Sequence, residues 1–162
     1  MILVIFEGLT ACLFVLLSCV IGIANGAHNM AFFYEEEVQN RVEELGLISK
    51  NQIKENSKKF ATYGILPYFV MTVLAVYVLN KTKGFWDPFW QICAILLIEG
   101  IFDRLFIDCY WVNHTKAWEI PGTEDLKPYI NKKAWIKKWS TTLIGYPIIA
   151  AIISLALSVI IK

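Results

Sequence analysis

The sequence has few charged residues, and positive and negative charges are almost equal in number. Only 18% of its 162 residues are Asp, Glu, Lys or Arg, whereas 57% are hydrophobic. This composition excludes a disordered chain, a coiled coil and a collagen-like repeat, and it is too apolar for an ordinary water-soluble fold. Fifteen basic and 14 acidic residues leave a net charge of +1, so no overall field attracts nucleic acid. We therefore expect no nucleic-acid partner.

Cysteine and histidine motifs are also missing. The four cysteines, which form no Cys-x-x-Cys pair, are Cys12, Cys19, Cys93 and Cys109. All lie in or at the ends of apolar runs, so we interpret them as small buried hydrophobic residues. The two histidines, His28 and His114, belong to no His-x-x-x-His or Glu-x-x-His element. A metal site that combines them with Glu99 and Asp103 stays an open alternative with a weak spacing signal, and no cofactor is indicated.

Four long apolar runs are what the sequence does contain. They cover residues 1–24, 62–80, 89–110 and 141–161. Each has about 20 residues, the helix length needed to cross a hydrocarbon core of about 30 Å. Helices satisfy their own backbone hydrogen bonds in lipid. The sequence therefore predicts an all-α fold, a four-transmembrane-helix bundle in one integral membrane domain, 1–162, with short helical connections at 25–61 and 111–140.

The distribution of Lys and Arg predicts the orientation of this bundle, because positive charges stay on the cytoplasmic side of a membrane. The connections 25–61 and 111–140 carry most of the basic residues. The connection between the second and third runs carries only Lys81 and Lys83, and the C-terminus only Lys162. We therefore expect both large connections in the cytoplasm and both termini outside.

The first large connection has the pattern of a helical hairpin near the bilayer surface. Apolar residues recur with helical spacing through 35–45, and Glu37 and Arg41 are placed for an i,i+4 ion pair. Ser49 and Gln52 match a capping box that opens a second short helix.

The second large connection ends in a basic and aromatic segment, 129–139. Its lysines alternate with tryptophan and isoleucine, a pattern typical of an interfacial helix. The four lysines are Lys132, Lys133, Lys137 and Lys138. We expect them to bind anionic lipid head groups, at about 1 kcal/mol each near the surface.

Polar residues within the apolar runs are the candidate functional residues, since a charge in lipid costs a few kcal/mol or more unless it is paired or used. On the first helix, at 100° per residue, one face carries Glu7, Asn25 and Asn29, with His28 on its flank. We expect this polar stripe to turn inward.

The third helix carries the densest group of polar residues. One face holds Glu99, Asp103, Tyr110 and His114, and a second face holds Arg104, Asp108 and Trp111. Arg104 and Asp108 are spaced for an ion pair. That pair does not neutralise Glu99 and Asp103, which need a proton, a cation or ligand donors.

Two polar stripes of matching length predict a cleft between the first and third helices that opens toward the cytoplasm. Its candidate catalytic groups are Glu99, Asp103, His114 and His28, as acids or bases. Its candidate ligand-binding residues are Glu7, Asn25, Asn29, Arg104, Asp108, Tyr110 and Trp111. The hypothesis is a protein that binds or modifies a lipid-like or isoprenoid ligand. The alternatives are a small proton- or cation-coupled transporter or channel, and an accessory subunit of a larger membrane complex; a homo-oligomer or a membrane-protein partner fits these.

Overall fold

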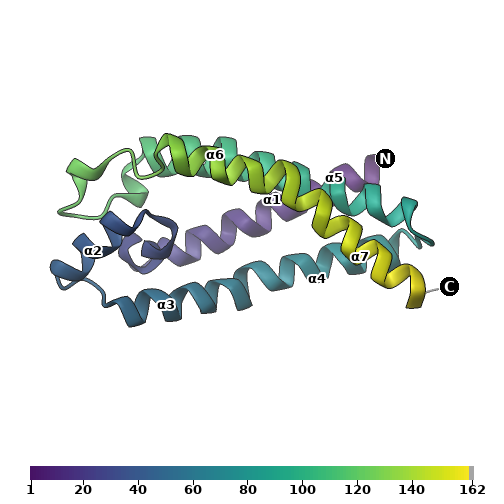
Figure 1. The fold of residues 1–162 in the computed structure, drawn as a ribbon, viewed down its shortest axis with the longest axis horizontal. Coiled ribbons are helices and arrows are strands. Elements are labelled where there is room, and N and C mark those ends of the chain that lie inside the picture. The colour runs from purple at the N-terminus through teal and green to yellow at the C-terminus, as the bar shows by residue number, and fades with distance from the viewer. Residues whose placement is uncertain (161–162) are drawn as a thin grey trace.

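The computed structural model describes residues 1–160 and consists of helices and loops, with no strand in that range. The long helices run along the longest axis of the molecule (Figure 1). They are α1 (Ile2–Ile23), the continuous α3–η2–α4–η3 helix (Lys50–Leu79), the continuous α5–η4 helix (86–112) and the continuous α6–η7–α7 helix (Lys132–Ile160). We refer to the last three as the α3–α4, α5–η4 and α6–α7 helices.

Each continuous helix joins segments of different winding. The segments are α3 (Lys50–Lys59), η2 (Phe60–Ile65), α4 (Leu66–Leu74), η3 (Ala75–Leu79), α5 (Trp86–Phe102), η4 (Asp103–Val112), α6 (Lys132–Ser140), η7 (Thr141–Gly145) and α7 (Tyr146–Ile160). The segments η2, η3, η4 and η7 are π-helical. A π-helical turn is wider than an α-helical turn, which changes the angle between successive side chains.

Three of these helices are long and apolar enough to cross a membrane: Ile2–Ile23, Lys50–Leu79 and Lys132–Ile160. The α5–η4 helix, which contains the predicted run 89–110, is not among them. Its second half carries Glu99, Asp103, Arg104 and Asp108, so every stretch of 18 residues within this helix contains at least three charged residues. Of the predicted run 141–161, Ile161 lies outside the described residues.

The predicted runs 62–80 and 141–161 belong to longer helices. They continue α3 and α6, so neither short segment is the separate surface helix that the sequence indicated. Pro67 and Pro147, which lack a backbone N–H, each follow a π-helical stretch. There Leu66 donates to the Ala61 carbonyl and Tyr146 to the Thr141 carbonyl, each five residues back. This bonding carries the helix past a proline that would otherwise interrupt it.

Residues 24–49 and 113–131 form a cap on the end of the bundle opposite both chain ends (Figure 1). Its short helices are η1 (Ala27–Phe33), α2 (Glu36–Glu44), η5 (Lys116–Trp118) and η6 (Glu124–Leu126). The predicted capping box at Ser49 and Gln52 is confirmed, with backbone N–H to side-chain oxygen distances of 3.3 and 3.0 Å. The predicted Glu37–Arg41 pair is wrong, because Arg41 reaches across the cap to Asp125 at 3.4 Å.

The bundle core is built on close contact between α1 and α5, which pack together more extensively than any other two elements. The contact face of α1 consists of small residues, including Gly8, Ala11 and Cys12. A Cβ atom at Gly8 would lie only 2.8 Å from Ile98 Cδ1. Small side chains allow the closest approach of two helices. The polar stripe of α1 therefore faces the α3–α4 helix, whereas the sequence predicted that it faces the third long helix.

Gly100 sets the spacing between α5 and α7. A Cβ atom there would lie 2.6 Å from Thr142 Cγ2 and 2.7 Å from Tyr146 Cε2. We expect Gly100→Val to lower the free energy of unfolding by about 2 kcal/mol, because overpacking forces helices apart. Thermal unfolding in detergent, followed by circular dichroism, measures this effect.

The matched control for this variant is Gly145→Ala in the facing helix. Its Cβ would meet only Thr141 Cγ2, at an ordinary 3.5 Å, and alanine favours a helix over glycine. Wild-type stability in both variants would contradict the close packing at Gly100.

Candidate functional site

A cavity of about 360 Å³ lies where the cap meets the α5–η4 and α6–α7 helices. Its charged wall is formed by Glu35, Asp103, Arg104, Asp108, Lys137 and Lys138. Its aromatic wall is formed by Phe33, Tyr34, Trp118, Tyr129 and Tyr146. Residues from both halves of the cap and from two long helices therefore converge on one space. We call it the cap cavity.

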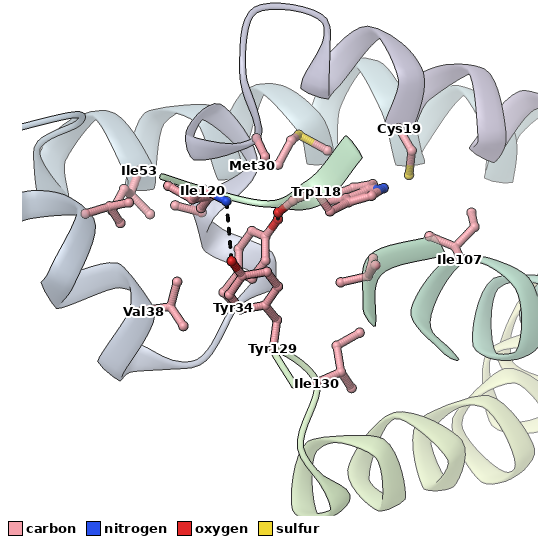
Figure 2. Packing of buried hydrophobic residues seen from close by; sticks show 14 of the residues in the cluster. Cys19, Met30, Tyr34, Val38, Ile53, Ile107, Trp118, Ile120, Tyr129 and Ile130 are labelled. Atoms are coloured by element: carbon pink, nitrogen blue, oxygen red, sulfur yellow. Dashed lines mark hydrogen bonds between the residues drawn. The ribbon is translucent and has the colours of Figure 1, made fainter. Parts of the chain in front are cut away.

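The aromatic wall is held rigid by contacts between distant parts of the cap (Figure 2). The Tyr34 hydroxyl donates to the Trp118 carbonyl at 2.7 Å, and the Tyr34 and Tyr129 rings meet edge to face at 4.9 Å. The Tyr129 hydroxyl accepts from the Ile120 N–H at 3.4 Å. Burial raises the pKa of the Tyr34 phenol well above its usual value, so the phenol stays protonated and remains a donor.

The charged wall is a network centred on Arg104. Its guanidinium bonds to Asp103 and to Asp108, which confirms the predicted Arg104–Asp108 pair. Lys138 from α6 donates to the other oxygen of Asp108 at 2.7 Å. The expectation that Asp103 lies outside the ion pair is wrong, because the π-helical winding of η4 brings neighbouring side chains together. The negative charges of two aspartates are thus balanced by the positive charges of Arg104 and Lys138.

Two hydrogen-bond donors in the cavity wall have no acceptor among residues 1–160. They are the indole Nε1 of Trp118 and the guanidinium Nε of Arg104, and both atoms are buried. The Trp118 side chain is only 1% exposed, and Figure 2 places its ring between Cys19 and Ile107, which also line the cavity. A buried donor without a partner costs about 1–3 kcal/mol. Two residues that line the cap cavity therefore carry a buried donor without a partner among residues 1–160.

Glu99 lies on the other side of Tyr146 from this network. Its side chain is buried, and one carboxylate oxygen accepts from Tyr68 at 3.2 Å and from Tyr146 at 3.4 Å. Tyr146 also lines the cap cavity, so it connects Glu99 to the wall of that cavity. Sequence reasoning missed both tyrosines, since nothing local marks them as partners of an acid two helices away.

The predicted polar residues of α1 belong to two other places. Glu7 accepts from Asn80 at 3.1 Å near the end of the bundle away from the cap. Asn25 and Asn29 line a separate cavity of about 440 Å³ that also includes Lys59 of α3. His28 is half-buried beside Gly26. None of these four residues lines the cap cavity.

The remaining predicted residues of the third helix also lie outside the cap cavity. Tyr110 is 57% exposed and stacks on the exposed His114 at 6.2 Å, and His114 Nδ1 is 2.8 Å from the Cys109 carbonyl oxygen. Trp111 packs edge to face on Trp118 at 5.4 Å. Residues 1–160 contain no group of three His, Cys, Asp or Glu side chains that could hold a metal ion. The combination of both histidines with Glu99 and Asp103 is therefore not assembled.

The four lysines of α6 divide into two groups. Lys132, Lys133 and Lys137 are exposed, and their contact with lipid head groups stays a prediction. Lys138 instead turns inward to Asp108 and lies 5.9 Å from the centre of the Phe33 ring. Sequence reasoning assigned all four to the surface, because alternation with tryptophan does not reveal a partner on another helix.

Comparisons of this chain with models of protein families, with curated protein sequences and with solved structures found no match. Its function must therefore be inferred from its own residues.

Proposed function

We propose that this chain is a four-span integral membrane protein whose cap cavity binds the head group of an amphipathic, lipid-like ligand. The observation that carries the proposal is the pair of buried donors, Trp118 Nε1 and Arg104 Nε, in the wall of a 360 Å³ cavity. A head group rich in acceptor oxygens, such as a phosphate ester, would satisfy both.

The α5–η4 helix is the fourth span in this proposal despite its charges. Its acids and its arginine point into the bundle, where Glu99 is 3% exposed and Asp108 4%. Between Glu99 and Asp108, the side chains that it exposes are apolar: Ile101, Leu105 and Phe106. Ionisable residues in membrane spans face the interior of the bundle and pair with one another. The helix therefore presents a surface suited to lipid.

The depth of the cap cavity supports a head group as its ligand. The uncharged stretches 60–79 and 141–160 are each roughly 20 residues, or about 30 Å, long, which matches a hydrocarbon core. One boundary of that core then lies near Lys59 and Ser140. Lys138, which pairs with Asp108, lies half a turn beyond Ser140. The charged wall is thus level with lipid head groups on the cap side, where Lys132, Lys133 and Lys137 would contact anionic lipid.

Ligand binding accounts for the acids better than proton or cation transport does. Glu7, Glu99 and Asp103 belong to three hydrogen-bond networks, and no hydrogen bond among residues 1–160 joins one network to another. A relay across the bilayer needs connected groups. An accessory subunit would instead copurify with a larger membrane protein, which the purification itself tests.

The proposed topology predicts a labelling pattern. We expect a membrane-impermeant maleimide, added to intact cells, to label Lys83→Cys and not Glu44→Cys in a chain without its native cysteines. Lys83 lies in the exposed connection between η3 and α5, and Glu44 is exposed at the end of α2 in the cap. Basic connections stay in the cytoplasm. After permeabilisation both variants should react, and labelling of Glu44→Cys on intact cells would contradict the topology.

The proposed site predicts a specific loss of affinity in Trp118→Phe. Phenylalanine keeps an aromatic six-membered ring and removes the pyrrole part of the indole, which carries the Nε1 donor. Binding of dioleoyl phosphatidic acid, titrated into the purified protein and followed by native mass spectrometry, should weaken roughly tenfold, the worth of about 1.4 kcal/mol.

Dioleoylglycerol, which lacks the phosphate, is the control ligand and should bind both proteins equally weakly. The double variant Lys132→Gln, Lys133→Gln separates surface attraction from the cavity, because it leaves the cavity wall intact. If that double variant loses affinity and Trp118→Phe does not, the ligand binds the surface lysines and the cavity proposal fails.

A further inference from the structure

A second cavity, of about 450 Å³, lies between α1 and α4 toward the end of the bundle away from the cap. Its walls are mainly apolar and include Phe14, Met71, Leu74 and Val78. Val78 is 60% exposed, so the cavity opens on the outer surface of the bundle. It forms because the small face of α1 packs against α5 and leaves α1 and α4 in much looser contact. We call it the lateral cavity.

The polar end of the lateral cavity contains acceptors without donors. One oxygen of Glu7 accepts from Asn80 Nδ2 at 3.1 Å, and the same amide nitrogen donates to Gln91 Oε1 at 2.8 Å. These two bonds occupy both N–H groups of the Asn80 amide. The second oxygen of Glu7 and the Oδ1 of Asn80 are buried with no donor among residues 1–160. Of these two residues only Glu7 lines the cavity, so its carboxylate marks the polar end of a mainly apolar space.

We infer that the lateral cavity binds a long-chain amphiphile from the leaflet opposite the cap, whose head group donates a hydrogen bond to Glu7. Glu7 lies about 7.5 Å along α1 from its first residue, just below the head-group level of that leaflet. The chain of the amphiphile lies against Phe14, Met71 and Leu74. This inference rests on the proposed membrane insertion and not on the ligand of the cap cavity.

The chemistry of the two ends selects the class of ligand. A hydroxyl or an ammonium group supplies the donor that the second oxygen of Glu7 lacks. A phosphate or carboxylate would bring further acceptors against it, which is unfavourable for buried groups. The lateral cavity therefore selects a long-chain alcohol or amine, whereas the cap cavity, whose unused atoms are donors, selects an acceptor-rich head group. The volume is within the range of small-ligand sites.

Photo-crosslinking in lipid nanodiscs tests the inference. The probes are four C16 chains with a diazirine in the chain and a terminal alcohol, amine, carboxylic acid or methyl ester. We expect the alcohol and the amine to label α4 near Met71 and Leu74 roughly tenfold more than the acid and the ester, as one or two hydrogen bonds to a carboxylate would give. Equal labelling by all four probes would overturn the inference.

Three variants separate the polar end from the apolar walls. Ala75→Leu fills the cavity and should remove labelling by every probe, because Ala75 lines it. Glu7→Ala should lower labelling by the alcohol and amine probes to the level of labelling by the ester probe. Leu9→Ala, on α1 outside the cavity, should leave all labelling unchanged. If Ala75→Leu is labelled as strongly as the wild type, the probes contact α4 from the bilayer and do not bind in the lateral cavity. Trp118→Phe should not alter this labelling, so failure at the cap cavity remains distinguishable.

Discussion

Arg104→Met is expected to destabilise the protein by about 3 kcal/mol or more, because it leaves two buried carboxylates without their shared cation. The side chains of Arg104, Asp103 and Asp108 are 11%, 18% and 6% exposed, so water can replace little of the lost interaction. Lys138 would still bond one oxygen of Asp108. Asp103 would have no cation in contact with it. Unfolding of the purified protein by sodium dodecyl sulfate in mixed micelles measures the change.

A second substitution shows whether the loss comes from charge. Arg104→Met combined with Asp103→Asn removes the carboxylate that the first change strands, and it should recover part of the lost stability. Arg104→Lys keeps a cation but cannot bond both acids with one planar group. Its stability should therefore fall between that of the wild type and that of Arg104→Met. If the double variant is less stable than Arg104→Met, the network does not act through charge balance.

Ala134→Phe is expected to weaken phosphatidic acid binding by at least roughly a hundredfold, the worth of about 2.7 kcal/mol, since the new ring occupies the space that the head group needs. Ala134 lines the cap cavity in the first turn of α6. The added ring removes volume without removing a hydrogen-bonding group. Native mass spectrometry of the protein titrated with dioleoyl phosphatidic acid measures the affinity.

Ile136→Phe is the matched control for this variant. It introduces the same ring on the same helix, at a side chain that is 51% exposed and outside the cavity. Its affinity should equal that of the wild type. Undiminished binding in Ala134→Phe would mean that the lipid occupies some other surface, such as the exposed lysines of α6.

The long helices were predictable because each contains a mainly apolar run of about 20 residues. The true starts of two of them were not, because Lys50–Lys59 and Lys132–Ser140 are polar enough to read as surface helices by themselves. These segments are joined to the apolar runs by the π-helical bonding before Pro67 and Pro147, and no pattern in the residue types indicates it. Proline in a sequence usually indicates the end of a helix, but here the wider π-helical turn allows the helix to continue through the proline.

The faces of the helices were predictable only where the winding is regular. Of the predicted stripe only Glu7 lies on α1, because α1 ends at Ile23 and the chain turns at Gly26 before it reaches Asn29. The neighbour that Glu7 faces is set by Gly8 and its close contact with α5. On η4 the wider winding changes the angle, so the face predicted for Glu99 does not continue to His114. Helical periodicity gives a face and does not give its partner.

The cap cavity was beyond prediction because its aromatic wall depends on contacts between distant segments. Tyr34 and Trp118 are 84 residues apart in sequence and meet through one hydrogen bond. Each tryptophan and tyrosine in the cap reads individually as a residue of an interfacial belt. Arg104 and Asp108 were recognisable as a pair, whereas Lys138, which completes the network, looked like its exposed neighbours.

A structure of the protein determined by electron cryomicroscopy in lipid nanodiscs shows directly whether the cap cavity holds a lipid head group. We expect non-protein density in the cap cavity that continues into the leaflet beside α6, with its polar end within hydrogen-bond distance of Trp118 Nε1 and Arg104 Nε. A cavity that contains only ordered water bonded to these two donors, with every acyl chain outside it, would rule out the proposed head-group site.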